Sequence, residues 1–177
     1  AHISVLPTLW FRNLWSFGLS KEKPLMYLKK EPREYGEVKV IDYTVGEYHF
    51  YFEKPVRTLF TENETNTEKL YGQPNKTPFV KDAFHTAVIQ NNYDWIHTKK
   101  EGTKFAPFYE FNIDPHASII IKLRLSKKEI LQDPFDGFDA LFHVRQYEAN
   151  EFYDKITTAK NNDQRAIQRQ AFAGMLW

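Results

Sequence analysis

The residue pattern changes character near Asp133-Pro134, and this change most limits what the 177 residues can fold into. Before it, segments alternate polar and apolar residues and are rich in β-branched and aromatic types, as strands are. After it, one face of an amphipathic helix is marked by Ala149, Phe152, Ile156 and Ala159. We therefore predict mostly antiparallel strands up to about residue 133 and mostly helix from about Asp139 onward.

Four segments carry the strand pattern: residues 37–44, 49–53, 103–112 and 116–125. The first two, split by Val45-Gly46-Glu47, predict a hairpin. The fourth is the clearest strand, because its centre, Ile119-Ile120-Ile121, suits a strand covered on both faces. Asn112-Ile113-Asp114-Pro115 predicts the turn between the third and fourth strands. In the helical part, Asn161-Asn162-Asp163 predicts a break before a second helix from about Gln164 to the end.

Charge and composition exclude several classes of site and partner. Lys plus Arg is 24 and Asp plus Glu is 23, a balance that argues against nucleic acid as a partner. No apolar run approaches the roughly 18 residues of a membrane-spanning helix, so we expect no membrane partner. The glycines match no dinucleotide or phosphate-loop pattern and the histidines no metal-ligand spacing, so we expect no cofactor and no metal. The absence of cysteine favours a cytoplasmic protein.

Aromatic residues are unusually frequent at 16% of the chain, and several gather beside hydrogen-bonding side chains. Three segments combine the two types: Trp10–Trp15, Phe60–Asn66 and Val80–His85. Proteins bind sugars with this combination, because polar groups meet the hydroxyls while aromatic rings cover the C–H faces of the sugar. The alternative is that the aromatic residues form core and the polar groups satisfy turns.

We expect the polar and aromatic residues of these three segments to converge on one region. The candidate substrate-binding residues are Arg12, Asn13, Trp15, Asn63, Glu64, Lys81, Asp82 and His85. Within this set, Lys81 or Arg12 could pair with Asp82 or Glu64, while Asn13 and Asn63 satisfy backbone groups. A buried network of this kind must be nearly complete, because an unpaired buried polar group costs about 1–3 kcal/mol.

Taken together and in order, the polar-aromatic segments and several others resemble the amino-terminal part of microbial proteins related to glycoside hydrolase family 63, which includes the processing α-glucosidase I. The resemblance spans nearly the whole chain. The matching segments are residues 6–13 (LPTLWFRN), 59–66 (LFTENETN), 80–85 (VKDAFH), 102–104 (GTK), Arg145, 148–153 (EANEFY) and 169–177 (RQAFAGMLW).

The resemblance implies a mainly β fold, an antiparallel, supersandwich-like β-sandwich, followed by two helices that lead toward an (α/α)6 barrel outside this chain. The implied domains are a sandwich portion, 1–133, and a helical linker with the first helix toward the barrel, 134–177. The chain would then be a piece of a longer protein, cut at both ends. Such proteins are inverting glycosidases that act on oligosaccharides, and both catalytic carboxylates lie in the barrel. We therefore expect no catalytic residue in this chain and no hydrolysis by the chain alone.

Two other functions stay open: a free-standing carbohydrate-binding module, and a structural or interaction domain without sugar contact. The apolar end of the second helix argues against a free-standing module. We expect this helix to expose Phe172, Met175, Leu176 and Trp177 if nothing follows it, and so to self-associate or pack on a neighbour.

Overall fold

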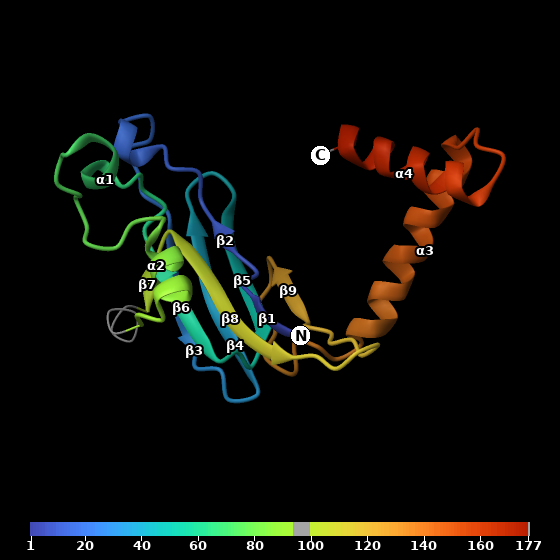
Figure 1. Ribbon diagram of the computed structural model, residues 1–177, viewed down its shortest axis with the longest axis horizontal. Helices are drawn as coiled ribbons and strands as arrows, with labels where there is room; N and C mark the ends of the chain where they lie inside the picture. The colour runs from blue at the N-terminus through green and yellow to red at the C-terminus, as the bar shows by residue number, and fades with distance from the viewer. Residues whose placement is uncertain (94–99, 177) are drawn as a thin grey trace. The chain divides into compact units, whose positions relative to one another are not determined.

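A computed structural model describes residues 1–93 and 100–176 of the chain. Contacts divide the chain into two units, residues 1–132 and residues 133–177 (Figure 1). The first unit is mainly antiparallel sheet and the second is helical, as the change of residue pattern predicts. In the part of the chain that the structure describes, no helix is both long enough and apolar enough to cross a membrane.

One sheet of the first unit is built around the long strand β8 (Lys104–Asn112). The strands β1 (His2–Val5) and β2 (Leu9–Trp10) follow one edge of β8 in one antiparallel register, interrupted between them. The strand β6 (Arg57–Thr61) pairs with the opposite edge. The predicted strand 103–112 is therefore confirmed, and it is the centre of this sheet.

The second sheet has the strand order β7-β3-β4-β5-β9. Its strands are β7 (Glu101–Gly102), β3 (Leu25–Lys30), β4 (Tyr35–Asp42), β5 (Gly46–Glu53) and β9 (Leu123–Ser126). The predicted hairpin is confirmed as β4 and β5. Its turn is held by Asp42 Oδ1, which accepts bonds from the backbone N–H groups of Thr44 (2.8 Å) and Val45 (2.9 Å).

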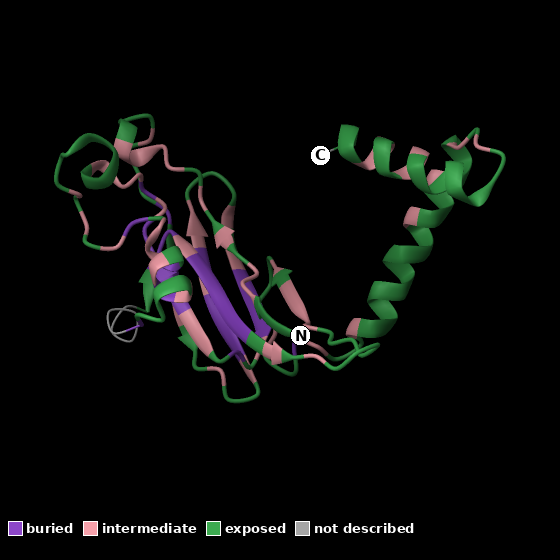
Figure 2. Cartoon of the chain, in the orientation of Figure 1, coloured by how far each residue is buried: buried purple, intermediate pink, exposed green. Residues whose placement is uncertain are grey.

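Aromatic residues from both sheets share the main core. It contains Met26, Val38, Val40, Phe50, Phe52, Phe60 and Phe105, all buried. The ring centroids of Phe60 and Phe105, on adjacent strands of the sheet around β8, lie 4.6 Å apart. A second core lies between that sheet and helix α2 (Ala83–Gln90) and contains Leu59, Phe84, Ala87, Tyr93, Ala106 and Phe108. Figure 2 shows this burial concentrated in the strands.

The prediction of a strand over 116–125 is wrong for most of its length. Only β9, Leu123–Ser126, forms, and Ile119 and Ile120 are 43% and 79% exposed. The reason lies in the partner strand, because the pairing runs from Ser126 back to Leu123, opposite Phe52. Strand β5 ends one residue after Phe52 and is followed by Lys54-Pro55, and proline offers no N–H for a ladder.

The helices of the second unit form as expected. Helix α3 spans Phe138–Ile156 and helix α4 spans Asn162–Leu176. The turn between them is held by Gln168 Oε1, which accepts bonds from the Thr157 hydroxyl (2.6 Å) and from the Thr158 backbone N–H (3.1 Å). No described residue of either helix is buried (Figure 2). Met175 and Leu176 are exposed as expected, whereas Phe172 is half-buried, and Trp177 lies outside the described residues.

Candidate functional site

The three polar-aromatic segments lie side by side in the first unit. The Trp15 indole Nε1–H donates to Glu64 Oε1 at 2.6 Å, which joins the first segment to the second. The Lys81 backbone N–H donates to the Glu64 carbonyl at 3.1 Å, and the Asn66 amide donates to both Asp82 oxygens, at 3.2 and 3.0 Å. These bonds join the second segment to the third, so Trp15 and Asp82, which are 67 positions apart, come to one region.

The position of this region follows from where the chain passes from one sheet to the other. Residues 101–102 belong to the sheet of β3, and Lys104 begins β8, so the chain changes sheets at Thr103. Thr103 is fully buried and donates its N–H to Thr61 O at 3.1 Å. A Cβ on Gly102 would lie 2.5 Å from the same Thr61 oxygen, so glycine alone allows this approach.

Two carboxylates are buried at this crossing, and we call Trp15, Lys23, Glu62, Asn63, Glu64 and Thr103 the Glu62–Glu64 cluster. Glu62 is 6% exposed and Glu64 is 7% exposed. The Lys23 Nζ lies 3.0 Å from Glu62 Oε2 and 3.8 Å from Glu64 Oε1, so one ammonium group bridges both. One positive charge therefore faces two buried carboxylates, so hydrogen bonds must provide the rest of the compensation that burial requires.

Hydroxyl and amide groups complete the Glu62–Glu64 cluster. The Thr103 hydroxyl donates to Glu62 Oε2 at 2.9 Å and accepts from the Asn63 backbone N–H at 2.8 Å. The Asn63 side-chain amide donates to Phe11 O at 2.8 Å, as its expected role of satisfying a backbone group requires. Asn63, the first residue of a glycosylation triplet, is therefore part of the packing between segments.

The third segment borders the cluster through its backbone and through Lys104. The Lys104 Nζ donates to Lys81 O at 2.8 Å and lies 4.6 Å from the Phe84 ring centroid. Burial lowers the pKa of the Lys104 ammonium, and the nearby Lys81 charge lowers it further. His85 lies on α2 with its side chain exposed.

Two expected residues lie at the margin. Arg12 is exposed and lines a separate hollow beside the β4–β5 turn, together with Asp42 and Tyr43. Asn13 bonds locally, with its Nδ2 2.6 Å from the Ser16 hydroxyl and its Oδ1 accepting from the Ser16 N–H at 3.2 Å. The suggested pairings of Arg12 or Lys81 are wrong. Glu64 is paired by Lys23, and Asp82 accepts bonds from Asn66, because these donors are the ones that the chain crossing brings within reach.

A hollow of about 290 Å³ adjoins Glu64 between the 3-10 helix η1 (Trp15–Phe17) and helix α1 (Thr67–Tyr71). Its lining includes Phe17, Tyr71 and Gln73, which sequence reasoning missed. Lys23 and Thr103 were missed as well, although Thr103 lies in a segment that carries the family resemblance. Phe17 and Tyr71 fall just outside the polar-aromatic segments, and no local pattern distinguishes them from other surface aromatics.

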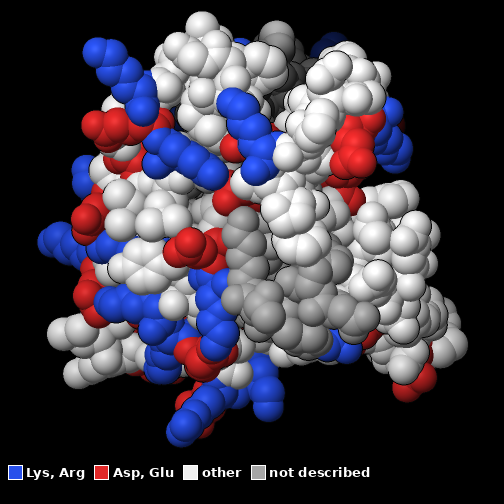
Figure 3. All heavy atoms as spheres, turned by 90° about the vertical axis from the view of Figure 1, so that its left-hand side faces the viewer, with Lys and Arg blue, Asp and Glu red and all other residues white. Residues whose placement is uncertain are grey.

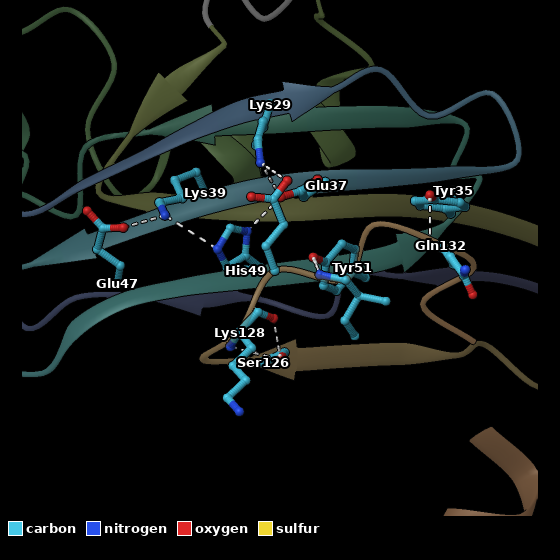
Figure 4. Close-up of polar contacts among 12 residues, drawn as sticks. Lys29, Tyr35, Glu37, Lys39, Glu47, His49, Tyr51, Ser126, Lys128 and Gln132 are labelled. Atoms are coloured by element: carbon cyan, nitrogen blue, oxygen red, sulfur yellow. Dashed lines mark hydrogen bonds and ion pairs between the residues drawn. The ribbon is translucent and has the colours of Figure 1, made fainter. Parts of the chain in front are cut away.

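A second group of polar and charged side chains surrounds the buried Glu37 and His49 on strands β4 and β5 (Figure 4). We call Lys29, Glu37, Lys39, Glu47, His49 and Glu129 the Glu37–His49 cluster. The His49 Nδ1 lies 2.7 Å from Glu37 Oε1, and the Lys29 Nζ lies 3.3 Å from the same oxygen. His49 and Glu37 are 4% and 6% exposed, so this pair is closed to a ligand.

The segment 127–132 is tied over the Glu37–His49 cluster. The Lys29 Nζ donates to Glu129 Oε1 at 2.5 Å, and the Ile130 N–H donates to the Tyr51 hydroxyl at 2.7 Å (Figure 4). The Tyr35 hydroxyl donates to Gln132 O at 3.3 Å. The hydrogen bond to Glu129 raises the pKa of Lys29, and burial raises the pKa of Tyr51. This cluster therefore fastens a chain segment to a sheet.

Metal binding has no support in either cluster. Across residues 1–93 and 100–176, no group of three or more His, Asp or Glu side chains is arranged to hold a metal ion.

Comparison with curated proteins finds one similar to this chain over nearly its whole length. An uncharacterized protein of Saccharomyces cerevisiae, YMR196W, is 31% identical over an alignment of 206 residues, which covers 98% of this chain. The chain spans only 19% of that relative's length. No protein-family model matches the sequence, and no solved structure matches it.

Proposed function

We propose that this chain is a non-catalytic, mainly β portion of a longer protein related to glycoside hydrolase family 63, which supports an (α/α)6 barrel and borders its substrate pocket. The observation that carries the proposal is the convergence of the three polar-aromatic segments. They belong to the segments that resemble the family, and their sequence separation means that local structure alone does not bring them together. Trp15 and Asp82 thus come to one region through two separate contacts with residues 63–66.

The contacts of the buried carboxylates favour a non-catalytic role. A glycosidase acid must donate a proton to the leaving oxygen, while its partner carboxylate activates water. Glu62 and Glu64 instead accept bonds from Thr103 and Trp15 and share the Lys23 ammonium group. These donors keep both groups as acceptors, which suits a positioning role rather than proton transfer.

The finer architecture is also part of the proposal. The two sheets, joined by one aromatic core, support assignment of residues 1–132 as the sandwich portion. Large apolar side chains remain exposed on the two helices of the second unit, and they support packing of these helices on a further part of the polypeptide. They are Leu141, Phe142, Val144, Tyr147, Phe152, Ile156, Ile167, Met175 and Leu176.

The relative's length is compatible with this proposal. Because the chain spans 19% of the yeast protein, the remaining length leaves room for a barrel. The alternative is that a second copy of the chain covers the apolar side chains of α4, among which Met175 is 75% exposed. Sedimentation of the purified chain tests self-association: a monomer contradicts self-association through α4 and leaves packing on a further part of the polypeptide as the proposal.

The test uses the chain and the full-length yeast relative together. We expect the purified chain to release no nitrophenol from 4-nitrophenyl α-glucoside, and the relative to hydrolyse an α-glucosidic linkage with inversion, followed by NMR of the released sugar. In the relative, substitution of the residues aligned with Asp82 and Asn63, to Asn and Ala, tests the pocket. Lost kcat/KM at unchanged thermal stability supports contact with substrate, and lost stability at unchanged kcat/KM supports a structural role only.

Two results would count against the proposal. One is hydrolysis by the isolated chain that disappears when one of its own carboxylates is substituted. The other is a full-length relative that hydrolyses no α-glycoside. The second outcome would favour the free-standing binding module or the structural domain.

A further inference from the structure

The hollow beside Glu64 combines the chemical groups of a sugar-binding site in this chain alone. It has a volume of about 290 Å³, near the lower end of the roughly 300–1,000 Å³ of ligand pockets, which suits one or two sugar rings. Its lining consists of Ser16, Phe17, Glu64, Thr65, Thr67, Tyr71, Gln73, Pro74 and Lys76. Hydroxyl, amide and carboxylate groups thus surround a space bordered by two aromatic rings.

Glu64 contributes a hydrogen-bond acceptor to the hollow that the protein itself leaves available. Its side chain is 9% exposed. Within the described residues, both of its side-chain contacts are made by Oε1, which accepts from Trp15 Nε1 at 2.6 Å and lies 3.8 Å from Lys23 Nζ. No described residue donates a hydrogen bond to the other oxygen, Oε2. Because Glu64 lines the hollow, a ligand or water there can donate to this oxygen.

The two aromatic residues are exposed at the edge of the hollow. Phe17 is 67% exposed and Tyr71 is 69% exposed. Tyr71 is the last residue of α1, whose two ends are fixed: the Asn66 side chain accepts from the Lys69 N–H at the start, and Gly72, at φ +67°, closes the end. The Asn75 side chain holds the same turn by accepting from the Thr67 N–H at 2.8 Å. The backbone that carries the tyrosine is therefore held in place before any ligand arrives, which lowers the cost of binding.

The charge around the hollow favours a neutral ligand. Glu64 shares the Lys23 ammonium group with Glu62, and Lys76 adds an ammonium group to the lining. On the face that carries η1 and α1, acidic and basic side chains are interspersed (Figure 3). A cationic ligand would meet these ammonium groups and an anionic ligand would meet the carboxylate. A pyranose ring, which offers hydroxyl donors and an apolar C–H face without charge, satisfies both the carboxylate and the aromatic rings.

We infer that the hollow between η1 and α1 binds a neutral pyranose ring of an oligosaccharide, with Glu64 Oε2 accepting a hydroxyl hydrogen bond and Tyr71 and Phe17 covering the ring. The site stands on the geometry of residues 1–132 and does not depend on the glycosidase proposal.

Maltotriose and mannotriose, titrated into the purified chain, test the inference. The signal of the Trp15 indole N–H, assigned with Trp15→Phe, reports on Glu64 because the two groups share a hydrogen bond. We expect one of the two sugars to shift this signal in a saturable way. Tyr71→Ala should weaken binding at least about tenfold, which equals about 1.4 kcal/mol. Glu64→Gln, which keeps an acceptor for Trp15, should weaken binding less than Tyr71→Ala does.

The matched control is Tyr147→Ala on α3, because Tyr147 is 69% exposed, the same fraction as Tyr71. It should leave the affinity unchanged, and thermal melting should show that all variants stay folded. The inference is overturned if neither sugar shifts the Trp15 signal at millimolar concentration, or if Tyr71→Ala and Phe17→Ala both leave the affinity of a bound sugar unchanged. Saturable binding of tetramethylammonium without binding of either sugar would also overturn it.

Discussion

The Glu62–Glu64 cluster and the Glu37–His49 cluster share one arrangement of side chains but lie in different surroundings. In each, one lysine bridges two carboxylates: Lys23 lies 3.0 Å from Glu62 and 3.8 Å from Glu64, and Lys29 lies 3.3 Å from Glu37 and 2.5 Å from Glu129. The Glu37–His49 cluster sits on regular paired strands beneath the segment 127–132. The Glu62–Glu64 cluster sits where the chain changes sheets, and one of its carboxylates borders a hollow.

The comparison teaches that burial of charge does not by itself mark a functional site. The buried Glu37 and His49 bond to each other, and their cluster holds the segment 127–132 on the sheet. Glu64 is buried nearly as deeply and, like Glu37, has its side-chain contacts with the described residues on one oxygen, yet it lines a hollow. The hollow, rather than the depth of burial or a remaining acceptor, separates the two clusters.

The largest effect is expected from Glu37→Ala. Removal of this carboxylate leaves His49 buried beside Lys39, with Lys29 losing one of its two partners. A buried group left without its hydrogen-bond partner typically costs about 1–3 kcal/mol, and Lys29 loses an ion-pair partner as well, so we expect the free energy of unfolding to fall by about 3 kcal/mol. Urea denaturation measures the change. As a control, Glu47→Gln removes a carboxylate that is 62% exposed and should cost much less. Similar values for the two variants would contradict the assignment.

A smaller effect is expected when the Glu62–Glu64 cluster loses its central hydroxyl. Thr103→Val keeps the side-chain shape but removes the bond to Glu62 and the acceptor of the Asn63 N–H. Because these groups are then buried without that partner, we expect a loss of about 1–3 kcal/mol in the same denaturation experiment. Thr58→Val, on the neighbouring strand β6, is the matched control and should be nearly neutral. A neutral Thr103→Val would mean that the network at the chain crossing contributes little to stability.

The two clusters should differ most clearly when one carboxylate in each becomes an amide. Glu64→Gln keeps an acceptor for Trp15 and loses only a 3.8 Å contact with Lys23, which is 41% exposed. We expect a cost of about 1 kcal/mol or less. Glu37→Gln should cost more, because His49 and Lys29 both contact one oxygen of Glu37. If Glu64→Gln proves the more damaging, the carboxylate at the hollow is structural in the same sense as Glu37.

The sequence predicted an element correctly where a periodic residue pattern coincided with a neighbouring element long enough to pair with it. The alternation in residues 37–53 predicted the hairpin. The spacing of Ala149, Phe152 and Ile156 predicted helix α3, although Ala159, from the same pattern, lies beyond its end at Ile156. The isoleucines at 119–121 have a strong strand pattern, but they do not form a strand. Pairing there depends on where β5 ends, and no local pattern in residues 116–125 indicates that position. Hydrophobicity alone could not supply that partner.

The candidate site was predicted only in part for a similar reason. Trp15, Asn63, Glu64 and Asp82 were found because polar and aromatic residues adjoin in the sequence. Lys23 and Thr103 were missed because their role arises where the chain passes between sheets, which sequence spacing does not reveal. The aromatic rings at the hollow, Phe17 and Tyr71, were missed because surface aromatics are common and their meeting depends on how α1 packs beside η1.

The smallest expected effect is a pH dependence confined to the tie between Lys29 and Glu129. The hydrogen bond from Lys29 lowers the pKa of the Glu129 carboxyl below its usual value of about 4.3. A carboxyl whose pKa is lower in the folded state contributes stability above its unfolded pKa and loses it as the pH falls through its folded pKa. Glu129→Gln should therefore have a lower Tm than the parent chain at pH 6, and the difference in Tm should close as the pH approaches 3.

Lys29 does not contribute to this pH dependence, because its pKa is raised and it loses its charge only at alkaline pH. Added salt should shrink the gap at pH 6, since Glu129 is 42% exposed. A gap that persists unchanged to pH 3 would mean that Glu129 holds the segment 127–132 by packing rather than by its charge.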